Sequence, residues 1–127
     1  MTTFSVREGV EASAREAGSL WVLELKGDLS TFTETRLREA YRQAAEAGAK
    51  HVLLNCAEVG YMSSSGIAVL IDFLREAQEH DRTLMVGGLN AHYRKVFQMM
   101  GLTQYLTLVA DEDEAQATAQ AATKTSS

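Results

Sequence analysis

Residues 52–86, VLLNCAEVGYMSSSGIAVLIDFLREAQEHDRTLMV, predict a strand, a helix and a second strand in succession. Val52-Leu53-Leu54 is apolar on both faces, as a central strand of a parallel sheet would be. Ser63 or Ser64 begins the helix, whose apolar stripe recurs at helical spacing and comprises Ile67, Leu70, Ile71, Leu74 and Ala77. Residues 83–86 form the second strand. Such a unit predicts two parallel strands joined by a right-handed crossover.

The residues before this unit predict two or three short strands. Residues 20–26 alternate as a strand does, with apolar side chains on one face at Trp21, Leu23 and Leu25. Phe4 and Val6 also alternate with polar neighbours. The polar residues 11–19 between them predict either an irregular strand or the loop of a hairpin. These early strands are expected to add an antiparallel part to the sheet.

Two more helices are predicted from capping residues followed by apolar stripes. Thr31-x-x-Glu34 matches a capping box, in which each side chain satisfies a free backbone amide of the other residue. The stripe that follows comprises Leu37, Ala40, Tyr41, Ala44 and Ala45. Asn90 is expected to cap the second helix, whose apolar face comprises Tyr93, Val96, Phe97 and Met100.

The C-terminal part predicts one more strand and one more helix. Residues 105–109 form the strand, and Asp111-x-x-Glu114 begins a helix with acidic residues at its positive end. We expect residues 1–115 to form the domain and residues 116–127 to be the helix end and a frayed tail. The order of elements therefore predicts a single α/β domain with a mixed, mostly parallel β-sheet and about four α-helices.

Composition excludes several classes of function. The 127 residues carry 12 Lys and Arg against 17 Asp and Glu, a net charge of −5. We expect no binding to nucleic acid, because neutralising phosphates requires clustered basic side chains. The longest strictly apolar run, residues 67–71, is too short for a membrane span, and the N-terminus lacks the apolar core of a signal peptide. The one cysteine, Cys56, fits a reducing compartment, so the expected location is the cytoplasm.

The sequence lacks the motifs of common catalytic and cofactor sites. It has no glycine-rich dinucleotide fingerprint and no phosphate-binding loop of the Walker type. Met62 stands two residues before Ser64, where the nucleophile elbow of serine hydrolases requires glycine. His51, His80 and His92 are not at metal-ligand spacing. We therefore expect a binding module that needs no cofactor and no metal, rather than an enzyme.

One local feature suggests a function, namely the serine turn, residues 61–66, with the sequence Tyr61-Met62-Ser63-Ser64-Ser65-Gly66. In a purely structural interpretation, the serines cap a helix and the glycine lets the chain turn. In a functional interpretation, the hydroxyls at a helix N-terminus form a phosphorylation site, where free amides and the helix dipole tolerate an anion. The residues alone leave both interpretations open.

The order of elements and four stretches resemble the STAS domain family, in particular the single-domain anti-sigma factor antagonists. The resemblance covers residues 4–115. It is carried by Leu25-Lys26-Gly27-Asp28-Leu29, by Val52-Leu53-Leu54-Asn55, by the serine turn, and by Val96-Phe97 with Met100-Gly101-Leu102. It implies a binding protein that sequesters an anti-sigma factor with serine-kinase activity and so frees a sigma factor. Phosphorylation then blocks this binding, and a serine phosphatase reverses the block.

The resemblance also implies site residues. The family's helix usually starts Asp-Ser-Ser-Gly with its first serine phosphorylated, which corresponds here to Ser64, with Ser63 and Ser65 as less favoured sites. The position of the family's Asp is Ser63, which keeps a capping oxygen and loses the charge. The expected partner-binding residues are Asp28, Leu29, Ser30, Met62, Ser63, Ser64, Ser65 and Gly66. We expect a monomer or a weak dimer.

Three alternative functions remain. STAS domains also occur as accessory subunits of membrane transport ATPases and as modules that bind small ligands. Since no membrane span is predicted here, the first of these roles would require a separate membrane partner. The last alternative is an enzyme with Ser64 as nucleophile, which no neighbouring base supports.

Overall fold

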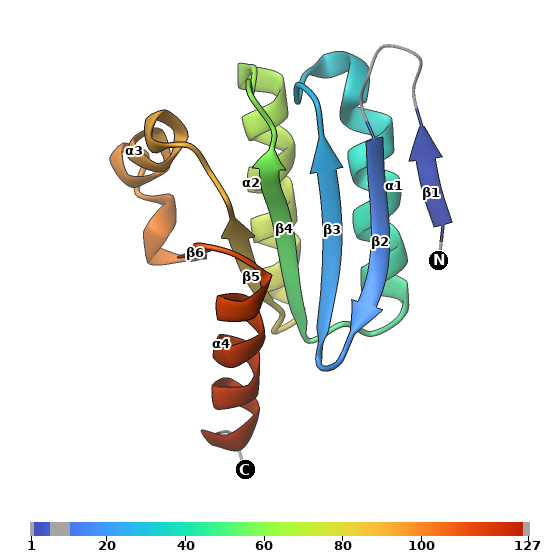
Figure 1. Ribbon diagram of the computed structural model, residues 1–127, viewed down its shortest axis with the longest axis vertical. Coiled ribbons are helices and arrows are strands. Elements are labelled where there is room, and N and C mark those ends of the chain that lie inside the picture. Colours follow the sequence, from blue (N-terminus) through green and yellow to red (C-terminus); the bar gives the residue numbers. More distant parts are fainter. Residues whose placement is uncertain (1, 6–10, 126–127) are drawn as a thin grey trace.

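The computed structural model describes residues 2–5 and 11–125, and the described strands form one sheet in sequence order (Figure 1). These strands are β1 (Thr2–Ser5), β2 (Glu11–Ala17), β3 (Leu20–Lys26), β4 (His51–Glu58), β5 (Thr83–Gly87) and β6 (Thr107–Val109). The first two pairings, β1 with β2 and β2 with β3, are antiparallel, and the following three are parallel. This arrangement confirms the mixed, mostly parallel sheet. Val6 lies outside the described residues.

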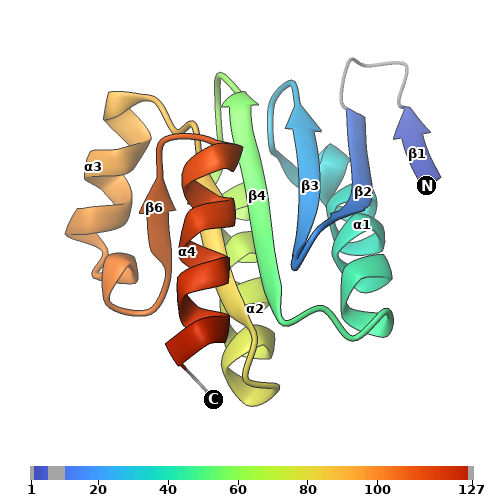
Figure 2. The same ribbon diagram turned by 60° about the horizontal axis from the view of Figure 1, so that its bottom comes forward.

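The four α-helices of the described residues pack around the sheet, on both of its faces. They are α1 (Glu34–Glu46), α2 (Ser64–Glu79), α3 (Ala91–Met99) and α4 (Glu112–Thr125), with 3₁₀ turns η1 (Thr31–Thr33) and η2 (Leu102–Gln104). Figure 2 shows α4 in front of the sheet, α1 and α2 behind it, and α3 beside the edge that β6 forms. None of the helices within the described ranges combines the length and hydropathy that a membrane span requires.

The central strand β4 is buried on both faces, as its sequence predicts. Leu54 and Cys56 belong to the larger apolar core, which α1 and α2 complete. Leu53 faces the other way and belongs to a smaller core with Leu20, Val22, Met85 and Val109. Ala115 and Ala119 of α4 close this smaller core. Two layers of helix therefore hold the sheet, and the loops at the ends of its strands remain at the surface.

The structure decides between the alternatives for residues 11–19 and corrects the predicted start of the helix that follows β3. Residues 11–17 form the regular strand β2, paired with β3 across a tight turn at Gly18. The predicted capping box of Thr31 and Glu34 is wrong, because α1 begins at Glu34 after Thr33, which makes no side-chain capping bond.

The predicted strand at residues 105–109 is shorter than expected. Gly101 adopts φ +76°, and the chain then forms η2, so β6 begins only at Thr107. At the other end of β6, α4 runs to Thr125, and the expected domain boundary after residue 115 falls inside this helix. The frayed tail expected for residues 116–127 stays a prediction.

Candidate interaction site at the serine turn

The serine turn lies at the carboxyl end of β4, next to the loop that leaves the carboxyl end of β3 (Figure 1). The two segments continue the parallel pairing through an isolated bridge between Leu29 and Met62. The Leu29 amide donates to the Tyr61 carbonyl at 2.8 Å, and the Ser63 amide donates to the Leu29 carbonyl at 2.8 Å. The structure therefore brings together the two segments that contain the expected partner-binding residues.

Gly66 permits this close approach. A Cβ atom at Gly66 would lie 2.6 Å from the Leu29 carbonyl oxygen, closer than real Cβ contacts occur. Because Leu29 is fully buried, its backbone has little room to move away. The glycine is therefore required by the packing of α2 against the β3 loop, and not by a left-handed backbone.

The three serines of the turn have different environments. The Ser63 hydroxyl is the N-cap of α2 and accepts a hydrogen bond from the Gly66 amide at 3.1 Å. The Ser65 hydroxyl accepts a hydrogen bond from the Thr31 hydroxyl at 2.9 Å. Ser64 is exposed, and within the described part of the chain its hydroxyl makes no hydrogen bond. Of the three, Ser64 is the hydroxyl that a second protein reaches without breaking a contact.

Tyr93 of α3 supports the turn from the side opposite Leu29. Its hydroxyl accepts a hydrogen bond from the Met62 amide at 2.9 Å and lies 3.3 Å from the Met62 carbonyl oxygen, to which it donates. The sequence placed Tyr93 only on the apolar face of a helix. No local sequence pattern predicts the hydrogen bonds of its hydroxyl, because Met62 lies 31 residues away.

The expected partner-binding residues divide by exposure. Leu29, Met62 and Gly66 are buried, Ser30, Ser63 and Ser65 are half-buried, and Asp28 and Ser64 are exposed. Tyr61, 53% exposed, adds an aromatic ring that the expected set omitted. A local signal for it existed, since side chains of extended backbone alternate between two faces and the neighbouring Met62 is buried. The most exposed side chains of the site are therefore Asp28, Tyr61 and Ser64.

Two potentially reactive side chains of the strand before the turn, Cys56 and His51, have shifted pKa values. Burial raises the pKa of the Cys56 thiol to about 12, so the thiol is neutral at ordinary pH. Burial and the neighbouring Lys50 lower the pKa of His51, which begins β4 at the end of the strand away from the turn. Among residues 2–5 and 11–125, no group of three or more His, Cys, Asp or Glu side chains could hold a metal ion.

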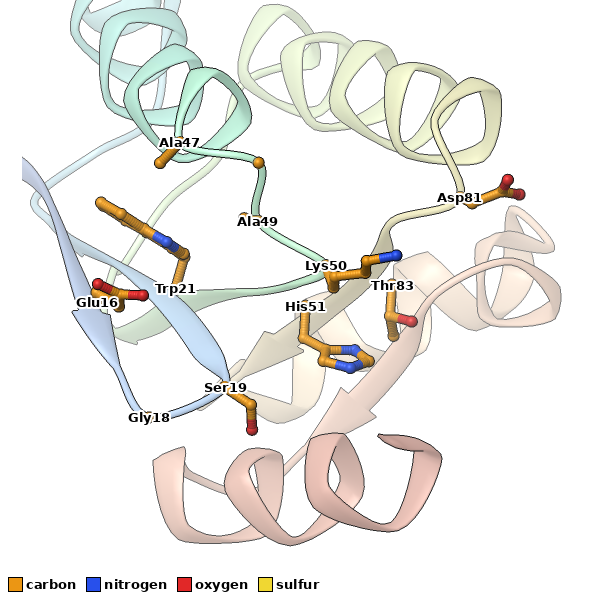
Figure 3. A pocket seen from close by; sticks show the side chains of 11 residues that line it. Glu16, Gly18, Ser19, Trp21, Ala47, Ala49, Lys50, His51, Asp81 and Thr83 are labelled. Carbon is orange, nitrogen blue, oxygen red and sulfur yellow. The ribbon is translucent and has the colours of Figure 1, made fainter. Parts of the chain in front are cut away.

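A hollow of about 630 Å³ lies at the amino ends of β4 and β5, at the opposite end of the sheet from the serine turn (Figure 3). Its side chains are divided between the two faces of the sheet. Trp21 points toward Ala47 at the end of α1, whereas His51 points toward α4. The β4 backbone passes between these two halves, so they do not converge on one ligand.

Comparison with known proteins identifies relatives for most of the chain. A family model described as "Mlab, STAS domain" matches residues 12–110. An anti-sigma-B factor antagonist of Staphylococcus epidermidis is 26% identical over 80 residues, covering 63% of this chain and 74% of that protein.

Solved structures show the same fold at low sequence identity. An anti-sigma factor antagonist from Mycobacterium paratuberculosis superposes with a TM-score of 0.79 at 14% identity, covering 92% of this chain and 99% of that one. The anti-sigma factor antagonist SpoIIAA in its unphosphorylated form superposes with a TM-score of 0.70 at 21% identity, covering 86% and 97%. These likenesses show that the arrangement of sheet and helices is shared.

Proposed function

Since the chain belongs to the STAS domain family, we propose that it is an anti-sigma factor antagonist that binds its partner through the serine turn. In this proposal the partner is an anti-sigma factor that is also a serine kinase. Binding sequesters the partner and frees a sigma factor, and phosphorylation of Ser64 ends the binding. The protein acts by binding and catalyses no reaction itself. A serine phosphatase would return it to the binding state.

The observation that carries this proposal is the environment of Ser64. Its hydroxyl is exposed at the N-terminus of the 16-residue helix α2, between two serines whose hydroxyls are engaged in hydrogen bonds. A kinase can therefore reach Ser64 without breaking the cap or the contact to Thr31. The names of the relatives support the choice of partner, since several are anti-sigma-B factor antagonists.

The surface around Ser64 is suited to contact with another protein. Tyr61 supplies an exposed ring, of a residue type enriched at protein interfaces, and Asp28 supplies a charge at the border of the turn. Leu29, Met62 and Gly66 are buried and support the shape of this surface. Binding would thus use a preformed surface, which lowers the entropy cost of association.

Phosphorylation at Ser64 would change this surface more than it changes the fold. A phosphate adds a charge of about −1.5 to −2 to a chain whose net charge is −5. At the helix N-terminus the anion is favoured by about 0.3–1 kcal/mol. An unmatched charge against a desolvated partner surface costs several kcal/mol, and each ~1.4 kcal/mol is tenfold in affinity. The cost at the interface is larger than the small effect on the helix, so the phosphorylated protein would stay folded and release its partner.

Ser63 stands where the family usually has aspartate, and the structure supports a retained role for this residue in capping. Its hydroxyl makes the cap bond to the Gly66 amide that a carboxylate oxygen would make. The negative charge beside Ser64 is missing. If the kinase recognises that charge, Ser63→Asp will increase the rate of phosphorylation at Ser64 and leave the start of α2 unchanged.

The test is affinity capture from native cells, with mass spectrometry of the captured proteins and of residues 61–66. The proposal expects an anti-sigma factor with a kinase domain and a fraction of chains phosphorylated at Ser64. Capture of a transport ATPase subunit with no phosphate in the turn would contradict it and favour the accessory-subunit function. Asp28→Ala provides a matched bait, which should capture less partner at equal stability.

A further inference from the structure

The Tyr93 hydroxyl bonds to the backbone amide and carbonyl of Met62, in the position where a neighbouring strand would otherwise provide their partners. Leu29 bonds to the backbone of Tyr61 and of Ser63, so the amide and carbonyl of Met62 point to the opposite side. That side belongs to β5 in the body of the sheet, but the pairing of β4 with β5 ends at Gly87. Tyr93 meets both Met62 groups there, at 2.9 and 3.3 Å.

These two hydrogen bonds are shielded from solvent. Met62 is 4% exposed and Tyr93 is 7% exposed. Buried backbone groups without a partner are costly, so the position of residues 61–63 depends on the hydroxyl and not only on the packing of the ring. On the opposite side, Leu29 fixes the same segment through two backbone bonds of 2.8 Å.

The hydroxyl is itself held by a well-anchored helix. The Asn90 side chain caps α3, because its oxygen accepts a hydrogen bond from the Tyr93 amide at 3.0 Å. One turn further along the helix, Phe97 is fully buried in the core. The Tyr93 ring therefore has a fixed point of attachment, and its hydroxyl can impose a position on the turn.

We infer that Tyr93 is a positioning residue for the serine turn, acting through the backbone of Met62. The turn is fixed between Leu29 and Tyr93, and α2 starts directly after this clamped segment. Loss of the hydroxyl alone should loosen residues 61–66 while the sheet stays intact. This inference deepens the proposed function, since it concerns the presentation of Ser64, but its structural part holds whatever the partner is.

The test is amide hydrogen exchange by NMR on Tyr93→Phe, with Tyr41→Phe as the matched control. Tyr41 is also buried, and its hydroxyl bonds to the Phe73 carbonyl at 3.3 Å and the Glu76 carboxylate at 2.6 Å, so it joins α1 to α2 away from the turn. Tyr93→Phe should accelerate exchange of the Met62 and Ser63 amides by roughly 5- to 100-fold, because it removes both hydrogen bonds to Met62. Amides of β4 should exchange as in the wild type, and Tyr41→Phe should leave the turn unchanged.

Equal acceleration in the turn and in β4, or none in the turn, would overturn the inference. The wild-type protein provides a second measurement that needs no variant. Among the described residues, the Met62 amide has the Tyr93 hydroxyl as its one acceptor, so it must be protected from exchange about as well as the Ser63 amide. An unprotected Met62 amide would also overturn the inference.

A separate measurement, the rate of Ser64 phosphorylation, depends on the proposed function. With the captured kinase, Tyr93→Phe should slow phosphorylation of Ser64 relative to Tyr41→Phe. A loosened turn with unchanged phosphorylation of Ser64 would confirm that Tyr93 fixes residues 61–66 and would overturn its role in presenting Ser64 to the kinase. Unchanged exchange would reject the positioning role and leave the proposed function standing.

Discussion

Gly66→Ala tests whether the serine turn depends on the close approach of α2 to the β3 loop. The new Cβ would lie 2.6 Å from the Leu29 carbonyl oxygen and 2.9 Å from its carbonyl carbon, where ordinary contacts begin at 3.4 Å. Both contacts are with backbone, and that backbone is held by hydrogen bonds to Tyr61 and Ser63. The substitution must therefore displace the turn or the loop.

Two effects of opposite sign decide the stability of this variant. Alanine is a better helix former than glycine by up to about 1 kcal/mol. Overpacking a site that cannot yield costs about 1–3 kcal/mol, and a displaced bridge loses hydrogen bonds as well. We expect the cost of overpacking to exceed the gain in helix propensity. The free energy of unfolding should fall by about 1–3 kcal/mol, and Tm by roughly 3–6 °C for each kcal/mol.

The assay is urea unfolding followed by circular dichroism, with Gly60→Ala as control. A Cβ at Gly60 would have the Asp28 carboxylate 4.0 Å away as its nearest neighbour, and its φ is not in the left-handed region. That control should be neutral or slightly stabilising, because it restricts only the unfolded chain. If Gly66→Ala were as stable as the wild type, the close packing of α2 on Leu29 would not hold.

Three further predictions concern the cap, the surface and the core. Ser63→Ala should lower the free energy of unfolding by about 1 kcal/mol through loss of the α2 cap, measured by urea unfolding, while Ser64→Ala should not. Asp28→Ala should weaken capture of the partner and leave Tm nearly unchanged, and an unaltered affinity by calorimetry would place the interface elsewhere. Because burial raises the pKa of Cys56 to about 12 from 9.0, the unfolded state loses that proton first, so stability should fall above about pH 9. Cys56→Ala should reduce this alkaline fall in urea midpoint, and an unchanged fall would assign it to other groups.

The strands and helices were predictable where one segment carries its own pattern. Val52-Leu53-Leu54 is apolar on both faces because helices cover both faces of β4. The predicted stripe of α2 is only partly correct, since Leu70, Leu74 and Ala77 are buried but Ile67 and Ile71 are half-buried. The buried side of α2 also includes Val69 and Phe73, which the predicted stripe omitted. The caps Ser63 and Asn90 were also predictable, because each bonds to an amide three residues away.

Contacts between distant segments were not predictable from such patterns. The capping box at Thr31 fails because its hydroxyl bonds instead to Ser65, 34 residues along the chain. Arg15 joins Glu24 to Glu112 of α4, which is 97 residues away, and no periodicity in either segment indicates that pairing. Tyr93 belongs to the same class, since an amphipathic pattern records burial of its ring and not the bonds of its hydroxyl.

The central claim is that Ser64 is the regulated residue on a preformed binding surface. The most direct measurement mixes the purified protein with the captured kinase and ATP, maps phosphate by mass spectrometry, and follows binding and circular dichroism together. We predict phosphate on Ser64, release of the partner, an unchanged spectrum, and a Ser64→Ala variant that binds and is never released. Phosphate on Ser63 or Ser65 instead, or release only with unfolding, would contradict the account.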